Sequence, residues 1–292
     1  MKQKHAMRLR LTALVAALGL STALGAQTDS SQTLLWKISG NGIQPSYLFG
    51  TIHLLPQADF DMDAKTVQAF EDTKQLVMEL DMDDPGMQAE MLQGMNMRGD
   101  TTLKDLLTAD EYAKVEALVF ESVKMPLSMM DRYKPMVVAS MLIHDYIEGT
   151  PASFEATFTQ MAVAAQKEIL GLETVTEQLA VFDSIPYAVQ AQELLHYTED
   201  DPEMRALFGK LVEAYKAEDM EAIDDYMEQE IDDPAEVEFM LHNRNRNWVP
   251  RMGKLASGKS TFFAVGAGHL GGDAGMIQLL RDAGYTVTPI LD

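Results

Sequence analysis

The chain has 292 residues, of which 45 are acidic and 23 are basic, so its formal net charge is −22 at pH 7. A surface this negative repels nucleic acid and anionic lipid, which argues against either one as a partner. The chain contains no cysteine, so disulfides, thiolate metal ligands and a cysteine nucleophile are all excluded. Any metal ion would have to be held by His, Asp, Glu, Asn or water.

Residues 1–26 have the composition of a secretory signal peptide. A basic segment with four Lys and Arg residues precedes the apolar run Leu11–Leu20, and small residues follow as far as Ala26. This order predicts cleavage by signal peptidase and a periplasmic or secreted protein. The apolar run is short for a transmembrane helix and no later run reaches the required length, so we expect no membrane insertion after the signal is removed. No feature of the sequence indicates an oligomeric state.

Short apolar runs alternate with segments of helical periodicity in the rest of the chain, which predicts an α/β fold. We expect a mixed central sheet, strand-Gly-x-x-His turns at one of its edges, and a large helical cap. Residues 27–292 then form one domain, with helical insertions at about 84–166 and 174–259. Crossover helices are expected at Asp63–Thr73 and Gly272–Ala283. The expected strands are Leu34–Ile38, Tyr47–Ile52, Leu76–Leu80, Glu168–Leu172, Thr261–Val265 and Thr286–Leu291.

One local pattern occurs twice, near the two ends of the chain. An apolar strand-like run ends in Gly50-Thr51-Ile52-His53, and another ends in Gly266-Ala267-Gly268-His269. Glycine lets the backbone turn sharply, and the next side chains then project from the carboxyl edge of the sheet, where open α/β sheets bind their ligands. Two imidazoles at one point can bind a transition metal or act as bases. The competing interpretation is two unrelated histidines, but the matched contexts favour a shared site for His53 and His269.

Two glutamates accompany strand-like runs. Glu79 lies within the apolar run Gln75–Asp81, and Glu173 lies at the carboxyl end of the run that starts at Ile169. A buried carboxylate needs a cation, a metal or a proton, because its unpaired burial costs several kcal/mol. Glu79 is therefore predicted to belong to a functional site. For Glu173 two interpretations stay equally open: a site residue, or a residue that begins the next helix.

A basic cluster interrupts the acidic composition at His242–Trp248, and it contains Arg244 and Asn245. Arginine in this setting can neutralise carboxylates around a site or clamp the carboxylate of a substrate. The competing interpretation is a helix surface whose charges pair with nearby acids. The contrast with the rest of the chain favours a role in the site.

Together, these residues resemble the TraB/PrgY/GumN/Tiki family. The resembling segments run in order through essentially the whole chain after the signal, and this ordered set is more specific than a single Gly-x-x-His. They are Leu35-Trp36-Lys37-Ile38, Tyr47–His53, Glu79-Leu80-Asp81, Gly171-Leu172-Glu173-Thr174 with Gln178-Leu179, Arg244-Asn245 with Trp248, Val265–Leu270 and Gly284-Tyr285-Thr286-Val287.

The resemblance implies an α/β fold and a TraB/GumN-like domain over residues 27–292. It also implies that the two Gly-x-x-His histidines and the strand glutamate are the functional core. The implied metal ligands are His53, His269 and Glu79, and the implied catalytic and supporting residues are Glu79, Glu173, Arg244 and Asn245.

The Tiki branch of the family acts as metal-dependent proteases, which implies a hydrolase that uses manganese or cobalt, with zinc as a further candidate. A metal in such a site would acidify water and polarise a carbonyl group, and Arg244 would stabilise the developing oxyanion. The expected function is a periplasmic or secreted metalloprotease-like hydrolase with a peptide or protein substrate. The alternative is a non-catalytic protein that binds a peptide, haem or metal in the same cleft, since the family also looks similar to haem-binding ChaN proteins.

Overall fold

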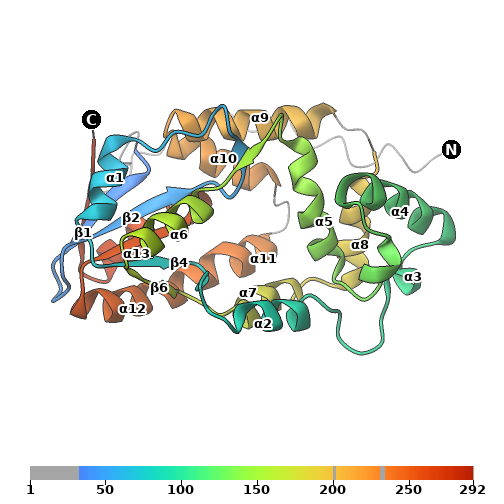
Figure 1. Cartoon of the computed structure of the whole chain (residues 1–292), viewed down its shortest axis with the longest axis horizontal. Coiled ribbons are helices and arrows are strands. Elements are labelled where there is room, and N and C mark those ends of the chain that lie inside the picture. Colours follow the sequence, from blue (N-terminus) through green and yellow to red (C-terminus); the bar gives the residue numbers. More distant parts are fainter. Residues whose placement is uncertain (1–32, 200–201, 231–233, 292) are drawn as a thin grey trace, which may run out of the picture. The chain divides into compact units, whose positions relative to one another are not determined.

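A computed structural model describes residues 33–199, 202–230 and 234–291. The expected signal peptide, residues 1–26, lies outside the described residues. Within them, six strands form one sheet in the order β6-β4-β7-β2-β1-β8, and β3 pairs with β5 in a separate ribbon (Figure 1). The strands are β1 (Leu35–Ser39), β2 (Ser46–Thr51), β3 (Leu55–Pro56), β4 (Gln75–Met78), β5 (Pro151–Ala152), β6 (Glu168–Gly171), β7 (Thr261–Gly266) and β8 (Thr286–Pro289).

Helices fill the intervals between the strands. The α-helices are α1 (Ala64–Glu71), α2 (Met87–Gly94), α3 (Leu103–Leu106), α4 (Ala109–Val123), α5 (Pro135–Leu142), α6 (Phe154–Ala164), α7 (Val175–Phe182), α8 (Tyr187–His196), α9 (Pro202–Lys216), α10 (Met220–Glu230), α11 (Pro234–Val237), α12 (Asn243–Gly258) and α13 (Met276–Asp282). Three short 3₁₀ helices (η1, Leu127–Met130; η2, Ile143–Tyr146; η4, Ala267–His269) and one π-helix (η3, Glu238–His242) complete the described elements.

The sheet is mixed, as predicted. Strands β6, β4, β7 and β2 run parallel to one another, whereas β1 is antiparallel to both of its neighbours, β2 and β8. The carboxyl ends of the four parallel strands therefore lie at one edge of the sheet. Several strand ends differ from the prediction by one or two residues, and the difference at β4 affects the site, because this strand ends at Met78. Glu79 thus follows the strand instead of lying inside it, where its carboxylate would have met the apolar side chains of the sheet.

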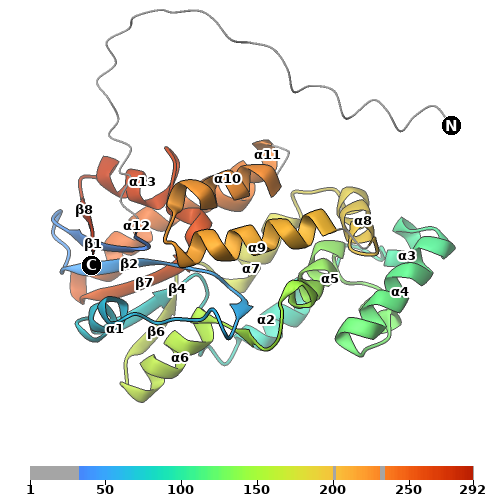
Figure 2. The ribbon, with the colours of Figure 1, turned by 90° about the horizontal axis from the view of Figure 1, so that it is seen from above.

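Both faces of the sheet are covered by helices (Figure 2). Successive side chains of a strand point to opposite faces, so each strand contributes to two apolar clusters. On one face, Phe49 and Phe262 pack with Phe70 of α1 and Phe158 of α6. On the other face, the cluster includes Trp248 of α12 together with buried residues of α13. The two faces hold the parallel strands in place and leave their carboxyl edge to polar residues.

The predicted helical cap is present. Residues 84–166 contain α2 to α6, and the described parts of 174–259 contain α7 to α12. Helices α3, α4, α5 and α8 contribute to a third apolar cluster, which includes no strand residue. None of the described helices combines the length and the hydropathy that crossing a bilayer requires.

Candidate functional site

One polar side chain follows each of the four adjacent parallel strands. In sheet order these residues are Glu173 after β6, Glu79 after β4, His269 after β7 and His53 after β2. Neighbouring strands lie about 4.8 Å apart, so residues from the two ends of the chain come together in one row. The short 3₁₀ helix η4 carries His269 back towards Glu79, and His269 Nε2 lies 3.9 Å from Glu79 Oε1. We call these four residues the strand-end row.

Three residues of the row border a space next to Gly266. A Cβ atom at residue 266 would lie 3.3 Å from Glu79 Oε1, 3.6 Å from His269 Cδ2 and 3.7 Å from His53 Nε2. The backbone at Gly266 has φ of −53°, which any L-residue can adopt. The glycine is therefore needed for the room it leaves between three potential ligand side chains.

Arg244 binds the row together from α12. Its Nε donates to Glu173 (3.1 Å), Nη1 donates to the Met240 carbonyl (3.0 Å) and faces His269 Nε2 (3.1 Å), and Nη2 donates to Glu79 (2.6 Å) and Glu173 (2.7 Å). A guanidinium has five N–H groups, and each of them has a partner here. Arg244 therefore neutralises carboxylates, as one of the two sequence interpretations held. In this arrangement it has no N–H left for an oxyanion, and that role stays a prediction.

The two glutamates of the row differ in their titration. Burial would raise the pKa of Glu79, but the positive charges of Arg244, of His53 and, at acid pH, of His269 lower it to about 2. The Gly266 N–H and the Gln178 amide also donate to its carboxylate, at 2.8 and 3.2 Å. Glu79 is therefore ionised at neutral pH.

Glu173 does not begin the next helix, because Thr174 is the N-cap of α7. The Glu173 carboxylate is buried and accepts hydrogen bonds from Arg244 and, at 3.3 Å, from Trp248 Nε1. Burial raises its pKa, although the hydrogen bond and the charge of Arg244 act in the opposite direction. The structure therefore favours the interpretation of Glu173 as part of the site.

Asn245 fixes the orientation of the His269 ring. The Asn245 Nδ2 group donates to the carbonyls of His269 (3.3 Å) and Ala274 (2.9 Å), so its Oδ1 faces His269 Nδ1 at 2.7 Å. Burial lowers the pKa of His269 to about 3, so the ring is neutral at pH 7. With its proton on Nδ1, the lone pair of Nε2 faces the site and accepts the N–H of Arg244.

Glu155, which the sequence analysis missed, plays the corresponding part for His53. Glu155 Oε1 lies 2.9 Å from His53 Nδ1 and accepts a hydrogen bond from Thr51 (2.6 Å), while Ser153 donates to Oε2 (2.9 Å). The hydrogen bond to Glu155 raises the pKa of His53 above 6.5. The His53 side chain is 70% exposed and that of Glu155 is 19% exposed. Because a carboxylate in the first turn of a helix is common for electrostatic reasons, its position in α6 gave no signal of function.

The match to a family of known proteins covers almost the whole described chain. The TraB/PrgY/gumN family model matches residues 34–289. The chain belongs to this family. The matched range includes every residue of the strand-end row.

Distant relatives carry a metalloprotease name. Metalloprotease TIKI1 of Homo sapiens is 23% identical over 319 residues, which cover 89% of this chain and 62% of the relative. Metalloprotease TIKI2 of Danio rerio is 23% identical over 322 residues, which cover 87% of this chain and 60% of the relative. The chain thus spans about three fifths of the length of these curated relatives. No solved structure shows a significant match.

The donor types of the TraB-family site suit a divalent metal, but their present spacing does not enclose one. His53 and His269 each hold one ring nitrogen against an oxygen acceptor and turn Nε2 towards the site, as metal-binding histidines commonly do. In the part of the chain that the structure describes, however, no group of three His, Asp or Glu residues is close enough to hold an ion. A metal at His269 Nε2 would use the lone pair that now accepts from Arg244, so the guanidinium would have to shift.

Proposed function

We propose that this TraB-family protein is a metal-dependent, metalloprotease-like hydrolase that acts on a peptide or protein. The observation that carries the proposal is the convergence of His53 Nε2, Glu79 Oε1 and the His269 ring around the space beside Gly266. Two imidazoles, once His53 has lost its ring proton, and one carboxylate form a ligand set that hydrolytic metal sites use. The distant likeness to proteins named metalloproteases supports the same activity.

The roles proposed for the side chains follow from their contacts. His53, His269 and Glu79 would hold the metal ion, which when bound would supply a Lewis acid and an activated water. Glu155 and Asn245 orient the two imidazoles through their Nδ1 atoms. Arg244 helps to keep Glu79 ionised and holds the buried carboxyl groups of Glu79 and Glu173 in place. The substrate would approach on the side of His53, whose side chain is the exposed one of the row.

The location of the protein belongs to the proposal as well. The signal-like composition of residues 1–26 supports export to the periplasm or secretion, with 27–292 as the functional domain. Mass spectrometry of the purified protein after expression with its own leader tests this. A mature amino terminus near residue 26 or 27 is expected. An intact leader on protein recovered from the cytosol would contradict the proposal.

Metal uptake is the first testable consequence. Manganese, cobalt and zinc are each titrated calorimetrically into the wild-type protein and into the His53→Ala and His269→Ala variants. We expect the wild type to bind at least one of these ions reversibly and each variant to lose the binding. His196→Ala is the matched control, because His196 is an exposed residue of α8 outside the row. Equal metal uptake by wild type and both site variants would contradict the ligand assignment.

Proton competition gives the direction of the pH dependence. A metal can bind His53 only after the ring proton has left, and the contact with Glu155 raises the pKa of that ring above 6.5. Metal affinity should therefore continue to rise as the pH is increased above 6.5.

A screen of a peptide library, with and without chelator, then tests turnover. Metal binding without any chelator-sensitive cleavage would favour the alternative, a binding protein that uses the same cleft.

A further inference from the structure

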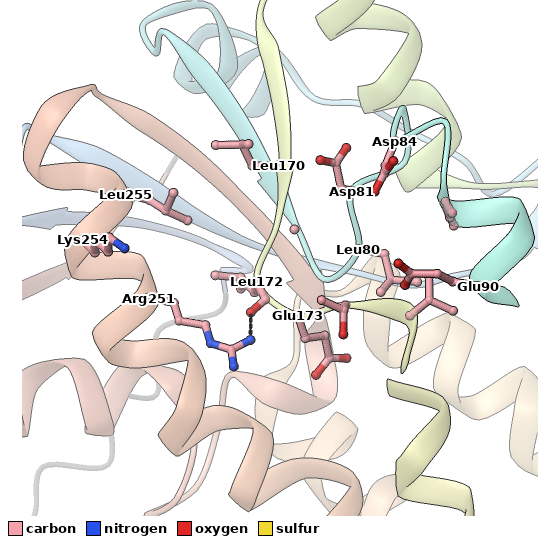
Figure 3. Close-up of a pocket in the computed structure, with 14 residues that line it drawn as sticks. Leu80, Asp81, Asp84, Glu90, Leu170, Leu172, Glu173, Arg251, Lys254 and Leu255 are labelled. Atoms are coloured by element: carbon pink, nitrogen blue, oxygen red, sulfur yellow. Dashed lines mark hydrogen bonds between the residues drawn. The ribbon is translucent and has the colours of Figure 1, made fainter. Parts of the chain in front are cut away.

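A cavity of about 390 Å³ lies at one end of the strand-end row, beside β6 (Figure 3). Its volume is within the range of about 300–1,000 Å³ that ligand pockets have. Glu173 lines this cavity and also binds Arg244. The cavity and the candidate site therefore share Glu173, although the cavity lining contains neither His53, Glu79 nor His269.

Strand β6 gives this cavity an unpaired backbone. It is the end strand of the sheet, with β4 on one side and no strand on the other among the described residues. Its residues Leu170 and Gly171 line the cavity and are partly exposed. A Cβ on Gly171 would meet backbone atoms of Asp81, Glu173 and Leu80 at 2.7–3.1 Å, so the glycine allows the segment after β4 to pack against β6. An open strand edge carries a row of N–H and C=O groups that can pair with an extended peptide.

The two walls of the cavity differ in charge (Figure 3). On one side, α12 contributes Lys254, Leu255 and Arg251, and Arg251 is already paired with Glu177. On the opposite side, the segment after β4 and helix α2 contributes carboxylates and apolar side chains. These residues are Leu80, Asp81, Asp84, Met87 and Glu90.

The second wall suits a long basic side chain. In the described part of the chain, no Lys, Arg or His lies within ion-pair distance of Asp84 or Glu90. Lysine and arginine pair an apolar stem with a charged end, which matches a wall of Leu80 and Met87 with carboxylates beside them. An acidic protein of net charge −22 also attracts cationic peptides over longer distances.

We propose that a peptide substrate pairs in an extended conformation with the outer edge of β6 and places a Lys or Arg side chain against Asp84 and Glu90. The inference rests on the proposed function in taking this peptide as the substrate. Three strand spacings of about 4.8 Å, from the peptide to β6, from β6 to β4 and from β4 to β7, separate the peptide from β7 and its histidine.

Direct peptide binding tests the inference without requiring turnover. Labelled, end-blocked heptapeptides rich in Val and Thr, with Lys, norleucine or Glu at the centre, are titrated into the full chain with chelator present, and fluorescence anisotropy is measured. We expect the Lys peptide to bind about tenfold more tightly than the norleucine peptide, which has the same stem without the charge. The Asp84→Asn/Glu90→Gln double variant should lose that difference. Asn keeps the acceptor that Asp84 offers to the Gly86 N–H.

Two controls separate the cavity from the overall charge and the strand edge from other contacts. The Glu116→Gln/Glu121→Gln variant changes the net charge equally on exposed positions of α4 and should keep the Lys preference. N-methylation of alternate peptide amides should weaken binding strongly for one alternating set and little for the other, because only one set faces β6.

Equal affinity for the three peptides, or a Lys preference that survives in the Asp84/Glu90 variant, would overturn the inference. Equal effects of both N-methylated sets would do the same. The outcome is separable from that of the proposed function. Chelator-sensitive cleavage without the Lys preference would leave the hydrolase standing and remove this cavity as its subsite. A Lys preference without any cleavage would leave a peptide-binding groove and remove the hydrolase.

Discussion

Arg244 satisfies two buried carboxylates, one imidazole and one carbonyl with its five N–H groups. Replacing it by alanine would leave Glu79 and Glu173 buried without their shared cation. Removal of one partner from a buried ion pair costs about 3–5 kcal/mol. We therefore expect Arg244→Ala to lower the free energy of unfolding by about this amount, measured by urea denaturation at pH 7. Arg244→Lys keeps the charge but has fewer N–H donors, so its free energy of unfolding should lie between those of the wild type and Arg244→Ala.

The neighbouring Arg246 is the matched control for this substitution. It lies on the same helix, is 44% exposed, and pairs with Glu238. Arg246→Ala should change the unfolding free energy by no more than about 0.5 kcal/mol, as surface substitutions usually do. If both variants lost the same stability, the loss would belong to α12 as a helix and not to the buried network.

Composition and motif were enough to predict most of the residues that meet in the site. The repeated Gly-x-x-His marked His53 and His269, and the basic cluster in an acidic chain marked Arg244 and Asn245. Glu155 could not be found in this way. Its role depends on the packing of α6 beside the end of β2, which is a tertiary contact with no local pattern in the sequence.

At the scale of the elements, the end of β7 shows why the second Gly-x-x-His motif begins with glycine. A Cβ on Gly266 would stand 3.3 Å from Glu79 Oε1 in the space between the row residues, while the backbone there accepts an L-residue. Gly266→Ala should therefore change the free energy of unfolding by less than about 1 kcal/mol. The same variant should block metal or ligand binding, which calorimetry measures.

Two other glycines make this prediction specific. A Cβ on Gly50 would come within 3.1 Å of the Ala267 backbone, so Gly50→Ala should destabilise the fold itself. Gly258 at the end of α12 has nothing within 4 Å of that position, so Gly258→Ala should leave both stability and binding unchanged. A Gly266→Ala protein that binds as well as the wild type would show that ligands do not use this space.

The strands of the main sheet were predictable because each is a short apolar run bounded by turn residues. The two-residue strands β3 and β5 were not, since a pair this short has no period and exists only through its partner. The predicted end of the third strand at Leu80 was also wrong. Apolar composition continues past Met78, but the backbone turns there to place Glu79 beside Gly266.

At the scale of the whole molecule, a buried lysine fastens parts of the helical cap to each other. Lys134, the N-cap of α5, has a side chain only 3% exposed, and its Nζ contacts the Leu179 carbonyl (2.8 Å) and Asp183 (3.1 Å) at the end of α7. Tyr187 and Arg98 also bind Asp183. Burial would raise the pKa of Asp183, but these hydrogen bonds and charges lower it below 3.8.

The lowered pKa fixes the direction of a pH effect on stability. A carboxyl group whose folded-state pKa is below the unfolded value of about 3.9 stabilises the fold fully above that pH. The contribution disappears as the pH falls through the lower, folded-state pKa. Asp183→Asn should therefore reduce the unfolding free energy by about 1–3 kcal/mol at pH 7 and by progressively less below pH 4.

Urea denaturation of the wild type and of Asp183→Asn at pH 7, 5 and 3 measures this difference. Asp100→Asn is the control, because the Asp100 side chain is fully exposed and its replacement should have little effect at any of these pH values. A difference for Asp183→Asn that grew towards pH 3 would contradict the assignment of Asp183 as a stabilising carboxylate.

Helical periodicity predicted that residues 84–166 and 174–259 are helical, but it could not predict how these helices pack. The amphipathic pattern shows that a helix has an apolar face, but it does not show which other helix or sheet packs against that face. Helices α4 and α8 are far apart in the sequence, and they meet in an apolar cluster away from the strands. The Lys134–Asp183 pair likewise joins residues that carry no sign of their pairing in the sequence.

The positions at which the two helical insertions, at about 84–166 and 174–259, leave the sheet have a consequence for the evolution of the protein. Both depart just after a residue of the strand-end row, Glu79 or Glu173, whereas the links at the opposite edge are as short as residues 40–45 and 72–74. The four residues of the strand-end row thus lie outside the insertions, whereas Glu155, Arg244 and Asn245 lie on α6 and α12, at the ends of the insertions. A descendant could exchange α2 to α5 or α7 to α11 for other helices and keep the strand-end row together with α6 and α12, so recruitment to a new task requires no new chemistry. A chimera that carries the insertions of one relative on the sheet of another should take its choice of target from the insertions.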